Sequence, residues 1–224
     1  MLKQKNAEFD FQWQNLESPA TQYNGDRVRE LLNLTGLPES FFKDKRCLDA
    51  GCGNGRYTYA LIHLGANVDS FDISPEAIEK CRKINSAAYL RNIYDLIPNP
   101  VYDFVFCWGV LHHLPEPREG FNKVALQVKQ GGTLHIMVYH RDTQAIYADG
   151  RRAWQFLGGD EKLNLCKRMI KRYGGNLHGW WDAFNPQYNW SYQPEEIETW
   201  FKEEGFKDIT LTQKYSLNMR GVKQ

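Results

Sequence analysis

Net charge is what this 224-residue sequence lacks most clearly, because 28 Lys and Arg residues are matched by 27 Asp and Glu residues and leave a formal charge of +1 at pH 7. Proteins that hold nucleic acid by its phosphates carry a basic surface, so this balance excludes an overall electrostatic signature of that kind. Basic residues do cluster at 151–152 and 162–172. The second run has an apolar stripe at helical spacing, which is typical of a surface helix with a solvated basic face.

Cysteine is scarce and scattered. None of the five cysteines follows C-x-x-C spacing, so no zinc-ligand pattern and no disulfide framework is present, and we predict no metal site. Several lie in apolar runs, where a cysteine is usually a small buried hydrophobe. The five are Cys47, Cys52, Cys81, Cys107 and Cys166.

Long apolar runs are also missing. No stretch approaches the length of a membrane span, and the first residues lack the apolar segment of a signal peptide. We therefore expect a soluble, cytoplasmic protein that has no membrane partner.

What the sequence does contain is a glycine-rich segment after an apolar run, Leu48-Asp-Ala-Gly-Cys-Gly-Asn-Gly55. This order predicts a strand, a tight turn and a helix start, with glycines that let the backbone approach a ligand closely. The spacing is G-x-G-x-G, whereas a dinucleotide loop has G-x-G-x-x-G, and Asp49 would repel a pyrophosphate. S-adenosylmethionine fits better, since it has an ammonium and a sulfonium but no phosphate. Asp72, which ends the next apolar run, is placed to accept both ribose hydroxyls.

Motifs in a fixed order resemble those of class I S-adenosylmethionine-dependent methyltransferases. The glycine segment, followed by Asp72, is similar to the family's h-D-x-G-x-G-x-G. Tyr102-Asp-Phe-Val-Phe-Cys-Trp-Gly-Val-Leu-His-His-Leu114 resembles its FD-x-V-x-x-x-x-V-L-H-H-L. Lys129-Gln-Gly-Gly-Thr-Leu-His-Ile136 resembles its L-x-P-G-G-x-L-x-I. The resemblance covers roughly residues 46–140 and implies methyl transfer, with S-adenosyl-L-methionine as the cofactor.

Apolar runs alternate with helical patterns from residue 46 to residue 140, which predicts an α/β, doubly wound, parallel sheet. The expected strands of this part cover 46–50, 68–72, 89–90, 104–108 and 133–139. The expected helices follow Gly55, begin at Ser74-Pro75, and run from about 118 to 129. A helix at 194–204 and strands at 206–212 and 216–222 complete the chain. The resemblance implies a mostly parallel, seven-stranded Rossmann-like sheet whose last strand is antiparallel.

One domain is predicted for residues 1–224, because α/β folds of this length commonly have one core. Its expected parts are an N-terminal helical cover (1–45), a cofactor-binding core (46–140), a helical insertion (141–192) between strands five and six, and a closing helix and strands (193–224). This fold usually places its acceptor-recognition elements in such an insertion, so the resemblance implies that 141–192 is the acceptor side.

The resemblance also implies the residues of the cofactor pocket. Gly51 and Gly53 would contact the methionyl end through their backbone, with Asp49 beneath the loop. Asn92 stands where the family often has an Asp that accepts from the adenine amino group, and its amide would make a neutral, weaker contact. The eight implied positions are Asp49, Gly51, Gly53 and Cys107 at the methionyl side, Asp72 at the ribose, and Ile73, Asn92 and Ile93 around the adenine.

Methyl transfer chiefly needs an oriented acceptor and the exclusion of water, and it needs a general base only when the acceptor enters protonated. His112 and His113 follow the fourth expected strand, and histidine titrates near neutrality. We favour His113 over His112 as the catalytic residue, with a purely structural turn as the alternative.

The candidate acceptor-binding residues are Tyr139, Asp182, Tyr192 and Trp13. Tyr139 ends the fifth expected strand. The aromatic-rich segment 180–192 contains Asp182 and Tyr192, while its tryptophans are expected to form a separate hydrophobic cluster. Trp13 lies in an F-x-x-Q-W context that resembles a cofactor-covering segment of one methyltransferase subgroup.

The leading interpretation is methyl transfer to a small molecule. Methylation of RNA or protein is the second, and a catalytically silent cofactor-binding partner is the third. DNA amino-group methylation is disfavoured, because Cys107-Trp-Gly-Val110 stands where those enzymes carry D/N-P-P-Y/F. The acceptor, the accepting atom and the oligomeric state are left open.

Overall fold

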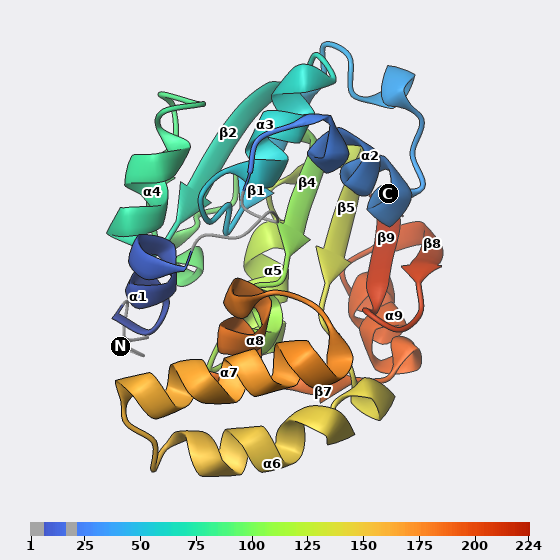
Figure 1. Ribbon diagram of the computed structural model, residues 1–224. Coiled ribbons are helices and arrows are strands. Elements are labelled where there is room, and N and C mark those ends of the chain that lie inside the picture. Colours follow the sequence, from blue (N-terminus) through green and yellow to red (C-terminus); the bar gives the residue numbers. More distant parts are fainter. Residues whose placement is uncertain (1–6, 17–21) are drawn as a thin grey trace.

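The computed structural model describes residues 7–16 and 22–224, and its main feature is a seven-stranded sheet (Figure 1). The strand order is β3-β2-β1-β4-β5-β9-β8. The pairings β1–β2, β2–β3, β1–β4 and β4–β5 are parallel, and β9 runs antiparallel to both β5 and β8. The predicted fold class is therefore confirmed. The strands are β1 (Arg46–Ala50), β2 (Asn67–Asp72), β3 (Tyr89–Leu90), β4 (Tyr102–Trp108), β5 (Val128–Met137), β8 (Phe206–Gln213) and β9 (Asn218–Lys223).

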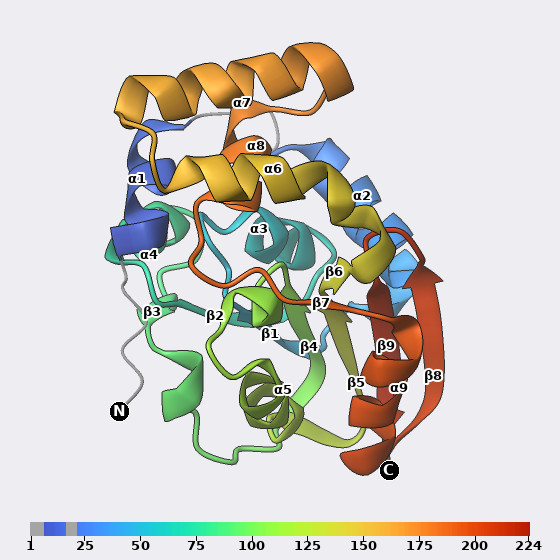
Figure 2. The same cartoon turned by 90° about the horizontal axis from the view of Figure 1, so that it is seen from below.

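Helices cover both faces of this sheet, as Figure 2 shows in a view along it. Alternate residues of β4 point to opposite faces, as the two-residue period of a strand requires. Phe104 and Phe106 pack with α2 (Gly25–Thr35) and α3 (Arg56–His63). Val105 and Cys107 pack on the other face, with α5 (Pro117–Ala125) and α9 (Pro194–Glu203). From Phe104 to Cys107, strand β4 is thus buried on both sides, which explains the unbroken apolar run over these residues.

Two further parts lie at the edge where the parallel strands end. Helix α1 (Ala7–Asn15) contacts α4 (Pro75–Cys81), and α4 begins with Ser74 as a side-chain cap and a proline in its first turn. The insertion between β5 and β8 lies beyond the C-terminal ends of β4 and β5 (Figure 1). It contains β6 (Tyr139–His140), α6 (Ala145–Trp154), α7 (Gly159–Tyr173), α8 (Leu177–Phe184) and β7 (Ser191–Tyr192). Short 3-10 turns cover Glu39–Phe41, Ile93–Asp95, Leu111–His113 and Arg141–Thr143.

Two of the three tryptophans in segment 180–192 lie in a separate cluster, as the sequence predicts, whereas the third, Trp190, is half exposed and lies outside it. Trp180 and Trp181 are buried against Trp154, Phe184 and Cys166. All five cysteines are buried, as expected. None of the helices in the described ranges is long and apolar enough to cross a membrane.

The expected helix over 118–129 is wrong at its C-terminal end. Helix α5 ends at Ala125, and β5 already begins at Val128, which pairs with Tyr102. The pairing then shifts, so that Phe104 lies opposite Thr133. The extended strand satisfies backbone groups along the start of β4, and this long-range gain outweighs the local helical pattern.

Candidate active site

The glycine turn after β1 forms the floor of the candidate site. Gly51 and Gly53 have φ angles of +78° and +54°, a region that side-chain-bearing residues rarely adopt. A Cβ atom at Gly51 would lie 2.3 Å from Cγ2 of Val110, and one at Gly53 would lie 2.6 Å from Cη2 of Trp13. Both positions therefore require glycine for conformation, and the space that a Cβ would take at each is filled by the neighbouring side chain of Val110 or Trp13.

Two carboxylates flank this turn. Asp49 is buried beneath it and accepts a hydrogen bond of 2.6 Å from Thr58 Oγ1. Burial raises the pKa of the Asp49 carboxyl to about 7, against the opposing effect of the Thr58 hydrogen bond. Asp72 accepts from the backbone N–H of Gly53 at 2.8 Å and of Ser74 at 2.9 Å. Burial also raises the pKa of Asp72, although these backbone donors favour its ionised form.

A cavity of about 370 Å³ extends from this turn toward the insertion. It brings together nine of the residues that the sequence singled out, from α1, the β1, β2, β3 and β4 ends, and α8. They are Trp13, Gly51, Gly53, Asp72, Ile73, Asn92, Ile93, His113 and Asp182. One concave site with apolar walls and a few convergent polar groups is the usual form of a small-ligand pocket.

The side-chain oxygen of Asn92 already accepts one hydrogen bond from the local backbone. Its Oδ1 accepts from the N–H of Tyr94 at 3.1 Å and caps the 3-10 turn Ile93–Asp95. Only the remaining lone pair of that oxygen and the NH₂ group are left for a ligand. This supports the expectation that its contact is weaker than that of Asp72.

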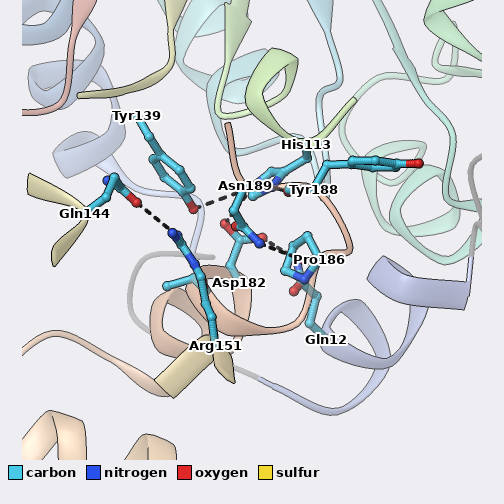
Figure 3. A network of polar contacts seen from close by, with 10 residues as sticks. Gln12, His113, Tyr139, Gln144, Arg151, Asp182, Pro186, Tyr188 and Asn189 are labelled. Atoms are coloured by element: carbon cyan, nitrogen blue, oxygen red, sulfur yellow. Dashed lines mark hydrogen bonds and ion pairs between the residues drawn. The ribbon is translucent and has the colours of Figure 1, made fainter. Parts of the chain in front are cut away.

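At the other end of the cavity, His113 lies beside Asp182 (Figure 3). His113 Nδ1 is 2.9 Å from the carbonyl oxygen of Tyr188. Because a carbonyl only accepts hydrogen bonds, Nδ1 carries a proton, and in the neutral ring the lone pair is on Nε2. Nε2 is 3.6 Å from Oδ2 of Asp182 and 3.5 Å from the hydroxyl of Tyr139. The basic nitrogen of His113 is therefore held in a fixed orientation beside a carboxylate.

Asp182 is the acid that gives this end of the cavity its charge. Burial acts to raise the pKa of its carboxyl, but His113, His178 and the Gln12 amide together outweigh burial and hold the pKa below its usual range. Gln12 Nε2 donates to Asp182 Oδ1 at 3.2 Å, from helix α1. A carboxylate that is ionised and hydrogen-bonded in this way can stabilise a positive charge on His113.

Five of the predicted residues lie outside the cavity wall. Tyr139 is one of them, and its hydroxyl is 3.5 Å from Nε2 of His113. His112 is buried behind His113 and stacks on Tyr139, with ring centroids 3.8 Å apart. Burial holds the pKa of His112 well below its ordinary value, so its ring is neutral. Tyr192 packs on Trp200. Cys107 is buried in β4, and the two residues after it, Trp108 and Gly109, reach the cavity. Asp49 lies under the turn, as expected.

Several cavity residues are absent from the sequence-based set. Gln12 belongs to the same F-x-x-Q-W motif as Trp13, so that motif was a usable signal for it. Arg56 directly follows the glycine turn, and its guanidinium carbon lies 4.9 Å from the ring centroid of Trp108. Glu30 from α2 and His178 from α8 also line the cavity, and no local pattern marks them.

Comparison with known proteins identifies the family of this chain. A family model described as a methyltransferase domain matches residues 20–211. The chain therefore belongs to this methyltransferase family.

Named relatives match over part of their length. An uncharacterized protein of Synechococcus sp. is 34% identical over 128 residues, which cover 52% of this chain and 31% of that protein. The mitochondrial ubiquinone biosynthesis O-methyltransferase of Schizosaccharomyces pombe is 31% identical over 134 residues, 52% of this chain and 49% of that enzyme. The chain thus spans a third to a half of the length of these relatives.

Among solved structures, the magnesium protoporphyrin IX methyltransferase of Synechocystis with bound S-adenosylmethionine is similar in fold. The TM-score is 0.61 at 16% identity, over 100% of this chain and 99% of that one. At this identity the likeness concerns the fold.

Proposed function

We propose that this chain transfers a methyl group from S-adenosylmethionine to a small-molecule acceptor, which is held at the C-terminal ends of β4 and β5 and against α8. The observation that carries the proposal is the single cavity, which joins the glycine turn and Asp72 to His113 and Asp182. When bound, S-adenosylmethionine supplies a methyl group on a positively charged sulfur.

The residues present fit this cofactor. The turn at Gly51 and Gly53 offers backbone that a Cβ would block, and Asp72 offers carboxylate oxygens for the ribose hydroxyls. Ile73 and Ile93 provide apolar contacts for the adenine, with Asn92 at its edge. The methionyl end of S-adenosylmethionine has two cations, an ammonium and a sulfonium. They suit a turn that has Asp49 beneath it and contains no lysine.

A small acceptor is favoured over RNA or protein, because the cavity is lined from above by Phe9 and Gln12 of α1 and by His178 and Asp182 of α8. The relative from Schizosaccharomyces pombe is named as a ubiquinone biosynthesis O-methyltransferase, and this name also supports a small-molecule acceptor.

The test has two stages. Calorimetry with S-adenosylhomocysteine should show one binding site, and incubation with S-adenosylmethionine and a low-molecular-mass cell extract should give a product heavier by one methyl group. The matched control is the Asp72→Ala variant, which should fail in both stages. Absence of nucleoside binding in the unmodified chain would refute the proposal.

A further inference from the structure

The acceptor end of the cavity holds a hydrogen-bonding atom that its own neighbours leave unused. Gln12 is 2% exposed, and its Nε2 faces the carboxylate of Asp182, which fixes the orientation of the amide. Its Oε1 has no hydrogen-bond partner among the described residues. A buried acceptor without a partner is unfavourable, so a ligand that brings a donor to this place would gain affinity.

The charged side chains at the acceptor end of the cavity favour some accepting groups over others. The ionised carboxyl of Asp182 would repel a carboxylate or phosphate group. An ammonium group would add a second cation to a site that receives the sulfonium and already has Arg151 behind Tyr139, 5.5 Å from that ring centroid. A neutral hydroxyl adds no charge of either sign. The charges around the site therefore favour a neutral accepting group, of which a hydroxyl is one.

A hydroxyl is a poor nucleophile until it loses its proton, and His113 is oriented to take it. Its Nδ1 proton is committed to the Tyr188 carbonyl, so the lone pair of Nε2 points toward Asp182, which lines the cavity, and toward the hydroxyl of Tyr139 behind it. Both of those neighbours are at distances that are long for strong hydrogen bonds. His113 and Asp182 both line the cavity, so an acceptor hydroxyl bound at this end would lie next to Nε2.

Building on the proposed function, we propose that the acceptor is a neutral hydroxylated molecule, that His113 Nε2 is its general base, and that Gln12 Oε1 binds a second donor group of the acceptor. The acceptor oxygen forms its bond to the methyl carbon as the sulfur–methyl bond breaks, and the sulfur keeps that electron pair. The hydroxyl proton goes to His113 Nε2. Asp182 stabilises the resulting imidazolium, so that the positive charge lost by sulfur is held opposite a carboxylate.

The accepting atom is tested with S-adenosylmethionine that carries a ¹³C-labelled methyl group, incubated with the chain and a low-molecular-mass extract. Two-dimensional proton–carbon NMR of the products separates O-, N-, S- and C-methyl groups. We expect an O-methyl signal. A label on nitrogen, sulfur or carbon, or on a carboxylate as a methyl ester, would overturn the inference while leaving the proposed function intact. Loss of every labelled product, with S-adenosylhomocysteine binding intact, would overturn both.

Variants then separate the role of His113 from that of Gln12. The acceptor in these assays is the unmethylated precursor of the labelled product. His113→Gln should lower kcat by about 10²- to 10⁴-fold, the usual range for general-base catalysis, with little change in the affinity for S-adenosylhomocysteine. Gln12→Leu should instead raise the acceptor KM by about 10-fold and weaken acceptor binding to the complex with S-adenosylhomocysteine, measured by calorimetry. The controls are His63→Gln and Gln14→Leu, both at exposed positions away from the cavity. A His113→Gln enzyme with nearly full kcat would exclude the base, and a Gln12→Leu enzyme with unchanged KM would exclude the second contact.

Discussion

At the scale of single residues, Asp72 has two tasks that share one carboxylate. Its oxygens hold the backbone N–H groups of Gly53 and Ser74, and they also face the cavity where the ribose is proposed to bind. Because each carboxylate oxygen has a second lone pair, both tasks are compatible. Asn92, by contrast, offers a neutral amide whose oxygen already accepts from Tyr94.

We therefore predict unequal effects at the two positions. Asp72→Ala should weaken S-adenosylhomocysteine binding by about 100-fold or more, since hydrogen bonds to a charged group contribute about 1.5–3 kcal/mol each. Asn92→Ala should weaken it by less than about 10-fold. Calorimetry measures both affinities, and thermal unfolding without ligand controls for loss of fold. Equal losses would contradict the ranking.

The buried carboxyl of Asp49 leads to a prediction of how the free energy of unfolding depends on pH. Its folded pKa of about 7 lies above its ordinary value of 3.8, so the native chain binds this proton more tightly than the unfolded chain does. This group therefore lowers the free energy of unfolding progressively as pH rises from about 4 to about 7. Asp49→Asn lacks the titration but keeps an oxygen for Thr58.

The measurement is the free energy of unfolding in urea across this pH range for both chains. The difference, variant minus wild type, should rise with pH by as much as about 4 kcal/mol and then level off. Taking the difference cancels the buried histidines, whose pKa values are lowered and which act in the opposite sense. Asp149→Asn, at an exposed site, is the control for the removal of one surface carboxylate. A flat difference for Asp49→Asn would show that its carboxyl titrates normally.

At the scale of elements, helix α1 is fitted directly onto the glycine turn. The Trp13 ring lies over Gly53, the Trp13 carbonyl accepts from Lys80 of α4, and Phe11 stacks on Trp181 of α8 at 4.6 Å. One short helix thus contacts the turn, α4 and the insertion. The absence of a side chain at Gly53 leaves room for the Trp13 ring in this arrangement.

Gly53→Ala should disturb this docking. The new Cβ would lie 2.6 Å from Trp13, and the left-handed φ of +54° costs about 1–2 kcal/mol for an alanine. We expect S-adenosylhomocysteine affinity to fall more than 10-fold and hydrogen exchange in α1 to accelerate. Gly25→Ala is the matched control, because nothing lies within 4 Å of its added Cβ. If adding Trp13→Leu to Gly53→Ala restores no affinity, backbone strain rather than the clash with α1 is the cause.

Elements of this kind were predictable where their signals are local. The strand around Phe104 and the helix start at Ser74 follow from an apolar run and from capping chemistry, and both formed where expected. The end of α5 was not predicted correctly, because Val128 pairs in the sheet with Tyr102, a residue distant in sequence. In the site, the glycine turn was readable from spacing alone. His178 and Glu30 were not, because they reach the cavity from helices that only tertiary packing brings there.

At the scale of the whole molecule, the cavity is where three parts of the chain meet. Helix α1, the turn after β1, and α8 of the insertion each contribute to its wall, and hydrogen bonds such as Gln12 to Asp182 link α1 to α8 across it. A ligand in this space therefore contacts parts that are far apart in the sequence. Its binding free energy should stabilise all of them together, whereas a ligand held by the turn alone would stabilise only the core.

This distinction can be measured by hydrogen exchange and thermal unfolding. With S-adenosylhomocysteine at about 100 times its Kd, the native state gains about 2.7 kcal/mol, which should raise Tm by about 5–10 °C in a chain of this size. Exchange should slow in residues 7–16, 51–55 and 177–184 at the same ligand concentration. The β8–β9 pair, at the far end of the sheet order, is the internal control and should show no local protection. Protection confined to residues 51–55 would mean that α1 and α8 do not close around the ligand. The proposal that one cavity holds both methyl donor and acceptor would then fail, because its two ends would not respond to the same molecule.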